Sequence, residues 1–168
     1  MTCSACNKLK LIWRSNLSNF FKIRLFRATV ESVLLYNSET WTINKTMQRK
    51  IDGCYTRMLR MALNISWKTK TSNVDLYQKL PPVSQTIRER RLRLSGHLVR
   101  HNEELAHNLV LWEPTGGRRN RGRQPVSYTD VLKQDTGLES IDELKTAMLD
   151  RNDWKKRIKL GRADARPR

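Results

Sequence analysis

Hydrophobic residues, cysteines and long apolar runs are all scarce in this 168-residue chain. Hydrophobic residues make up 38% of the sequence, which predicts a modest core beneath a wide charged surface. The longest apolar stretches, such as residues 33–36, are far shorter than the ~20 residues that a membrane-spanning helix needs, so no membrane contact is expected. Three cysteines without a framework spacing, and no signal-like start, indicate a reducing intracellular setting, either nucleus or cytoplasm.

Positive charge is abundant and unevenly distributed. The chain has 33 Lys and Arg against 16 Asp and Glu, a formal net charge of +17 and a pI near 10.5, which is typical of polyanion-binding proteins. Residues 83–101 contain five arginines and one glutamate, and residues 118–123 contain four arginines and no acid. Residues 126–153 reverse the balance, with seven acids and three bases. This segregation indicates surfaces with different roles.

Apolar residues recur at steps of three and four in three segments, which predicts an all-α fold, a helical bundle of about three longer helices. The first helix is expected over residues 20–36, with a stripe of Ile23, Phe26, Val30, Val33 and Leu34. The second carries a seven-residue repeat of Met47, Ile51, Cys54, Met58, Met61 and Ile65. The third is expected over residues 83–101, with Ile87, Leu94 and Leu98 beside a stripe of Leu92, Ser95 and Val99.

Local signals place shorter helices and two special glycines. A short helix from Ser72 or Asn73 to Tyr77 should end before two prolines. Three more are expected at 128–136, 140–149 and 153–160, with Gly137 as a stop and Ser140 and Glu143 forming a capping box. Gly53 should cost its helix ~1 kcal/mol while allowing a neighbour to approach closely, and Gly96 should permit a tight crossing.

The predicted domain organisation follows from these elements. Residues 1–17 form an N-terminal segment, 18–112 a helical domain, 113–126 a basic flexible arm, 127–160 a small helical segment and 161–168 a disordered tail. The arm is assigned because residues 113–125 hold three glycines, two prolines and four arginines but no apolar residue.

Three groups of basic residues are candidates for contact with RNA or DNA. The arm supplies Arg118, Arg119, Arg121 and Arg123, which could follow a phosphate backbone. The third helix supplies Arg88, Arg90, Arg91 and Arg93, which wrap around more than half of it, so some must meet acids or carbonyls inside the fold. Lys68 and Lys70 follow Trp67, which is the best candidate for stacking on a base, whereas Trp41 and Trp154 are expected to be core anchors.

Metal-assisted chemistry is not expected. His97 and His101 have a zinc-ligand spacing, and Cys3 and Cys6 could supply sulfurs, but residues 7–96 separate the two pairs, far more than in a compact zinc finger. The aspartates of the acidic segment occupy helix-capping and solubilising positions. The sequence therefore predicts no metal site, no cofactor and no catalytic residues.

The order of several short motifs resembles the C-terminal region of reverse transcriptases from non-long-terminal-repeat (LINE-type) retrotransposons. The matching pieces are Val33–Tyr36, Ser38–Trp41, Asp52–Arg60, Arg91–Leu94, Gly96-His97, Gly117–Arg119 and Gly122-Arg123. The resemblance covers roughly residues 18–160, and no single piece carries it. The chain departs from the family pattern at Gln124 and at Asn37, where Gly would ease the turn.

This resemblance implies a thumb and a connecting segment that lie against template and primer after the palm. The palm's paired aspartates do not occur, since no two aspartates are adjacent in the sequence, and two-metal chemistry needs such clustered carboxylates. The expectation is a catalytically incomplete fragment that binds the nucleic-acid backbone without base specificity. The alternative is a host-recruited or relic protein whose apolar helix faces bind a protein partner.

Overall fold

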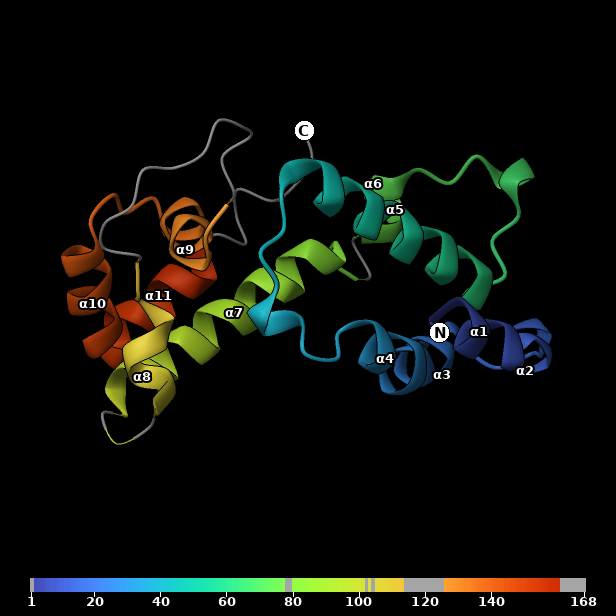
Figure 1. Cartoon of the computed structure of the whole chain (residues 1–168). Coiled ribbons are helices and arrows are strands. Elements are labelled where there is room, and N and C mark those ends of the chain that lie inside the picture. The colour runs from blue at the N-terminus through green and yellow to red at the C-terminus, as the bar shows by residue number, and fades with distance from the viewer. Residues whose placement is uncertain (1, 78–79, 102, 104, 114–125, 161–168) are drawn as a thin grey trace, which may run out of the picture. The chain divides into compact units, whose positions relative to one another are not determined.

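The computed structural model describes residues 2–77, 80–101, 103, 105–113 and 126–160 (Figure 1). In these ranges the regular structure is helical and contains no strand, which confirms the predicted all-α class. No helix in them is long and apolar enough to cross a lipid bilayer. The basic arm and the C-terminal tail lie outside the described residues, apart from the arm's two ends.

The chain divides into two compact units. Unit 1 comprises residues 1–38 and 45–86, and unit 2 comprises residues 39–44 and 87–168. The last of the three divisions falls inside helix α7 (Val83–Arg100), and residue 113, where the sequence analysis places a boundary, lies within unit 2. The C-terminal part of the third long helix thus belongs with the short helices that follow it.

Unit 1 consists of one long helix, a broken helix and several short ones. It begins with α1 (Thr2–Lys8) and α2 (Lys10–Arg14), where the sequence had assigned no helix. The first predicted long helix is α3 (Asn19–Phe26), a π-helical turn (Arg27–Glu31) and α4 (Ser32–Leu34). A 3₁₀ turn (Ser38–Thr40) crosses into unit 2, and α5 (Lys45–Ala62), a 3₁₀ turn (Trp67–Thr69) and α6 (Asn73–Tyr77) follow.

The π-helical turn changes which side of the first long helix is buried. Phe26 and Val30 are fully buried, as the stripe predicted, but Val33 is 44% exposed and Leu35 is buried instead. A π turn holds one extra residue per turn, which rotates everything after it relative to a 3.6-residue pattern. Asn37 then adopts the left-handed conformation with φ 55°, at the position where the sequence suggested that Gly would ease the turn.

The buried face of α5 differs from the predicted stripe. Tyr55, Met58, Leu59 and Ala62 are buried, at helical spacing. The Tyr55 ring packs edge-on against Phe26 with 5.5 Å between centroids, and its hydroxyl donates to Glu31 Oε2 at 2.8 Å. Met58 of the predicted repeat is buried, but Met47, Cys54 and Met61 are exposed, so the prediction was wrong for those three positions. The larger apolar area of Tyr55 and Leu59 sets the inward face.

Unit 2 surrounds the C-terminal part of α7 with four shorter helices. These are α8 (Leu105–Val110), α9 (Tyr128–Thr136), α10 (Ile141–Leu149) and α11 (Arg151–Leu160), gathered together in Figure 1. Their core contains Leu92, Val99, Val110, Leu132, Leu144, Met148, Trp154 and Ile158. The predicted capping box at Ser140 and Glu143 is present, and Gly137 ends α9 with φ 72°.

The two glycines singled out in the sequence behave differently. At Gly96, a Cβ atom would overlap the indole of Trp154, whose Nε1 donates to Leu92 O at 2.7 Å. The predicted tight crossing is therefore present, and Trp154 is a core anchor as expected. At Gly53, a Cβ atom would meet nothing within 4 Å among the described residues, so the predicted close approach there is wrong. Trp41, the other expected anchor, is only half-buried.

Candidate nucleic-acid interface

The four arginines of α7 divide between two sides of the helix. Arg88 and Arg91 are one turn apart and face the interior of unit 2, where Arg91 is 4% exposed. Arg90 and Arg93 are also three residues apart and are exposed to solvent. This division agrees with the expectation that some of the cluster would bind acids and carbonyls inside the fold.

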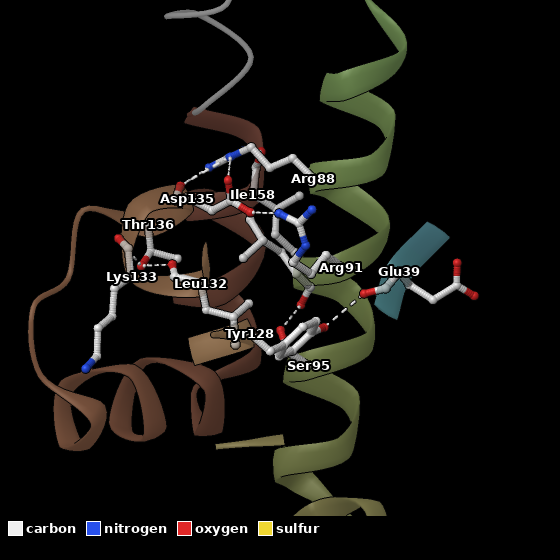
Figure 2. Close-up of polar contacts among 11 residues, drawn as sticks. Glu39, Arg88, Arg91, Ser95, Tyr128, Leu132, Lys133, Asp135, Thr136 and Ile158 are labelled. Carbon is white, nitrogen blue, oxygen red and sulfur yellow. Dashed lines mark hydrogen bonds and ion pairs between the residues drawn. The ribbon is translucent and has the colours of Figure 1, made fainter. Parts of the chain in front are cut away.

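The inner pair binds Asp135 near the end of α9 (Figure 2). Arg91 Nη1 donates to Asp135 Oδ2 at 2.5 Å. Arg88 donates through Nη2 and Nε to the Asp135 carbonyl oxygen at 2.6 and 3.2 Å, and through Nη1 to the Ile158 carbonyl at 3.3 Å. Both guanidinium groups thus connect α7 to α9, and Arg88 also reaches α11. Carbonyls near helix ends accept such charge-assisted bonds well.

Burial controls the ionisation of the groups around this pair. Desolvation raises the pKa of Asp135, while the neighbouring guanidiniums of Arg91 and Arg88 oppose that shift. Burial also raises the pKa of Tyr128 to about 12, and its hydroxyl donates to Glu39 O at 3.1 Å. The inner pair is therefore part of the packing of unit 2, with the Arg88 and Arg91 side chains 17% and 5% exposed.

The outer pair keeps its charge near solvent. Arg93 has a side chain 66% exposed and lies 3.5 Å from Glu89, one turn earlier on α7. Glu89 is buried, but most of the Arg93 side chain is in solvent, where an anion can reach it. Arg90 is exposed beside it. The predicted role of both in nucleic-acid binding stays a prediction.

Lys68 and Lys70 lie on a structured loop of unit 1. Ser66 Oγ accepts from Lys68 N at 3.3 Å, and Thr69 Oγ1 donates to Ser66 O at 2.6 Å. Lys70 adopts the left-handed conformation with φ 47°, and both lysines are exposed. The side chain of Trp67 lies outside the described residues, as do Arg118, Arg119, Arg121 and Arg123 of the arm.

Helix α5 carries a basic groove that the sequence analysis did not predict. It has a volume of about 530 Å³ and is lined by Arg49, Asp52, Gly53, Thr56, Arg57, Arg60 and Asn73. The other α5 residues that line it lie three, four, seven, eight and eleven positions after Arg49. This spacing places them on one face of the helix. Asp52 is already engaged, since its Oδ1 accepts from Ser84 N at 2.9 Å. The helical spacing of the arginines was the available signal.

Arg60 connects this groove to its surroundings. Its Nη2 donates to Thr71 O at 2.7 Å and to Asn73 Oδ1 at 2.8 Å, which fixes the end of the loop that carries Lys68 and Lys70. Arg60 also lines a second groove of about 450 Å³, together with Lys10 and Arg14 of α2. We call Arg49, Arg57, Arg60, Lys10 and Arg14 the basic band of unit 1.

The residues considered for metal binding do not form a site in the described ranges. There, no group of three or more His, Cys, Asp or Glu is arranged to hold a metal ion. The His97 and His101 rings lie 4.2 Å apart between centroids and are exposed in unit 2, His97 in the last turn of α7 and His101 directly after it. Cys3 and Cys6 belong to unit 1.

The chain is similar to an uncharacterised transposon-derived protein of Caenorhabditis elegans. The two are 27% identical over 146 residues, which cover 79% of this chain and 52% of the relative. The chain therefore spans about half the length of the curated relative it matches. No protein-family model and no solved structure matches the chain. The similarity is consistent with an origin in a transposable element.

Proposed function

We propose that this chain is the thumb and post-palm portion of a non-long-terminal-repeat retrotransposon reverse transcriptase, and that it binds the backbone of RNA or DNA without performing catalysis. The basic band of unit 1 is the observation that carries the proposal. It combines two helices into one cationic surface with a groove between arginine side chains. The motif order in the sequence and the similarity to a transposon-derived protein support the assignment of origin.

The chemistry of the basic band suits phosphate better than an apolar ligand. Arg49 and Arg57 are exposed at the groove, and a guanidinium can bind a phosphate through two parallel hydrogen bonds. Arg60 is held by Thr71 and Asn73, so it keeps the groove in shape while adding positive potential. Backbone contact of this kind reads no sequence, and it favours binding that is broad in specificity and strongly salt-dependent.

Further cationic side chains would extend the binding surface: Lys68 and Lys70 in unit 1, and Arg90 and Arg93 in unit 2. The arginines of the arm would add further phosphate contacts. Arg88 and Arg91 are left out of the proposed interface because they bind Asp135 inside unit 2. The chain contains no adjacent aspartates, so the proposal includes no polymerase step.

Fluorescence anisotropy with a labelled single strand, a duplex and an RNA–DNA hybrid tests the proposal. We expect similar affinities for unrelated sequences and a linear fall of log K with log salt. A double variant, Arg49→Gln with Arg57→Gln, should lower the magnitude of that slope by ~2, about one per lost phosphate contact. The matched control is Arg24→Gln with Arg27→Gln, which removes the same charge from exposed positions outside the grooves.

Two results would contradict the proposal. The first is no binding at low salt by a chain whose circular dichroism spectrum is helical. The second is an equal loss of slope in the control variant, since a general effect of net charge would not need the basic band.

A second candidate function is protein binding by apolar side chains of unit 1. Leu11, Leu17, Phe20 and Phe21 are 84, 47, 69 and 57% exposed, and the two phenylalanine rings pack edge-on at 5.8 Å. Exposed apolar side chains at this density favour a protein partner. Association that is insensitive to salt and is lost in Phe20→Ser with Phe21→Ser would support this function over the first.

A further inference from the structure

All three cysteines of the chain line one groove of unit 1. Cys3 and Cys6 come from α1 and Cys54 from α5, and the groove has a volume of about 510 Å³. The fold therefore brings together thiols from two helices that are far apart in the sequence. In the described residues no metal-binding group of three or more ligands occurs, so the groove is a cluster of thiols without a metal cage.

The three thiols differ in access. Cys6 is fully buried, with its sulfur 3.9 Å from the Met58 carbonyl oxygen and 3.7 Å from the Met61 sulfur. Cys3 and Cys54 are exposed at the groove. A small oxidant in solution can reach the exposed two but not the buried one, because thiol oxidation follows exposure and thiolate character.

The two exposed thiols, Cys3 and Cys54, line the same groove, and Cys3 influences the ionisation of Cys54. Burial, followed by the charge and hydrogen bond of Cys3, raises the pKa of the Cys54 thiol, and the Arg57 guanidinium opposes this shift. Both helices also contribute to the contacts that pack unit 1, so the pair is presented on a folded scaffold. Thiols from two packed helices that line one groove can be joined when one of them is activated.

We propose that Cys3 and Cys54 are a redox modification site, where a hydroperoxide joins the two thiols in a disulfide that ties α1 to α5. The Cys54 thiolate attacks the terminal peroxide oxygen, the O–O bond breaks, and the departing oxygen takes a proton to leave as water or an alcohol. This step gives a sulfenic acid on Cys54. The Cys3 thiolate then attacks the Cys54 sulfur, the S–O bond breaks, and the released hydroxide takes a proton to leave as water.

The electron balance closes with the named oxidant. The two sulfurs together lose two electrons, and these reduce one peroxide. Cys54 is assigned the first attack because it is exposed in the groove next to the Arg57 guanidinium, which offsets part of the rise in its pKa that burial and Cys3 cause. The reaction should be slow at neutral pH, because both attacks need a thiolate, and it should accelerate as the pH rises toward the pKa of the Cys54 thiol.

Mass spectrometry of the full chain after treatment with hydrogen peroxide tests the proposal. We expect a monomer that has lost two hydrogens, and a non-reduced protease digest in which the peptides containing Cys3 and Cys54 are joined. Dithiothreitol should reverse both changes. The oxidised chain should unfold at a higher temperature than the reduced chain, because the cross-link restricts the unfolded state.

Single variants separate this pair from the other thiol. Cys6→Ala should still form the link, whereas Cys54→Ser and Cys3→Ser should not, and circular dichroism would establish that each variant is helical. A folded wild-type chain that gives only oxidised single cysteines or intermolecular dimers would overturn the proposal. So would a Cys3–Cys6 link that persists in Cys54→Ser at the wild-type rate.

Discussion

The arginines of α5 in unit 1 and those of α7 in unit 2 have opposite surroundings. On α5, Arg49 and Arg57 are exposed at a groove. On α7, Arg88 and Arg91 turn inward to Asp135. The difference depends on the partners, because in unit 2 the inner arginines meet the partly buried Asp135 carboxylate and the backbone carbonyls of Asp135 and Ile158. A basic composition therefore does not by itself locate a binding surface.

The largest effect should come from removing the acid that holds the inner arginines. Asp135→Ala leaves the 4%-exposed Arg91 without its carboxylate partner. Breaking a buried pair on one side costs about 3–5 kcal/mol, so we expect a loss of that size in the free energy of unfolding. Urea denaturation measures it, and Arg57→Gln in unit 1 is the control, with a change within about 0.5 kcal/mol. Equal losses in both variants would remove the contrast between the units.

Substitutions of glycine compare the interior of unit 2 with the surface of unit 1, and the larger effect is expected in unit 2. Gly96→Ala would place a methyl group against the Trp154 indole. Overpacking of this kind costs about 1–3 kcal/mol, and the indole's bond to Leu92 O should weaken as well. Thermal unfolding together with tryptophan fluorescence checks both effects. An unchanged midpoint would mean that the crossing is looser than described.

Alkaline pH should weaken unit 2 through Tyr128. Its pKa is raised to about 12 in the folded chain, whereas an unfolded tyrosine ionises near pH 10. Between these values the folded state holds a proton that the unfolded state has lost, so stability falls as pH rises through this window. Two pKa units correspond to a full loss of ~2.7 kcal/mol, about half of which falls below pH 11. Urea unfolding from about pH 9 to about pH 11 measures it, and Tyr128→Phe should show a smaller fall with pH.

The smallest effect is expected at Gly53 on the surface of α5. Gly53→Ala meets no atom within 4 Å among the described residues, and alanine favours a helix by ~1 kcal/mol over glycine. We therefore expect stabilisation by up to that amount, measured in the same denaturation assay. Destabilisation would indicate that a part of the chain outside the described residues packs against this position.

In unit 2, local signals in the sequence predicted where helices begin and end, but they did not predict the long-range contacts. The helix at 128–136 and the caps at Ser140 and Gly137 matched because short-range hydrogen bonds fix helix ends. Helical spacing also predicted that the four arginines of α7 wrap around more than half of the helix and that some of them meet acids or carbonyls inside the fold. It could not show that Arg88 and Arg91 are the inner ones, because the deciding partner, Asp135, is more than forty residues away in the sequence.

In unit 1 the register of the buried faces could not be predicted from periodicity. The π-helical turn at Arg27–Glu31 rotated the buried side of the first helix. On α5, Tyr55 and Leu59 are buried in place of three of the Met and Cys residues of the predicted repeat. The basic groove was missed for a related reason. Its arginines are dispersed in the sequence, and they form one surface only when α5 and α2 are folded.

The most direct test compares one arginine from each unit. Arg57→Gln and Arg91→Gln each remove one positive charge, and both variants should be assayed for unfolding midpoint and for the salt dependence of RNA binding while folded. We predict that Arg57→Gln lowers the salt slope by about one and leaves stability nearly unchanged, whereas Arg91→Gln lowers stability and leaves the slope unchanged. An equal loss of slope in both variants would contradict the account.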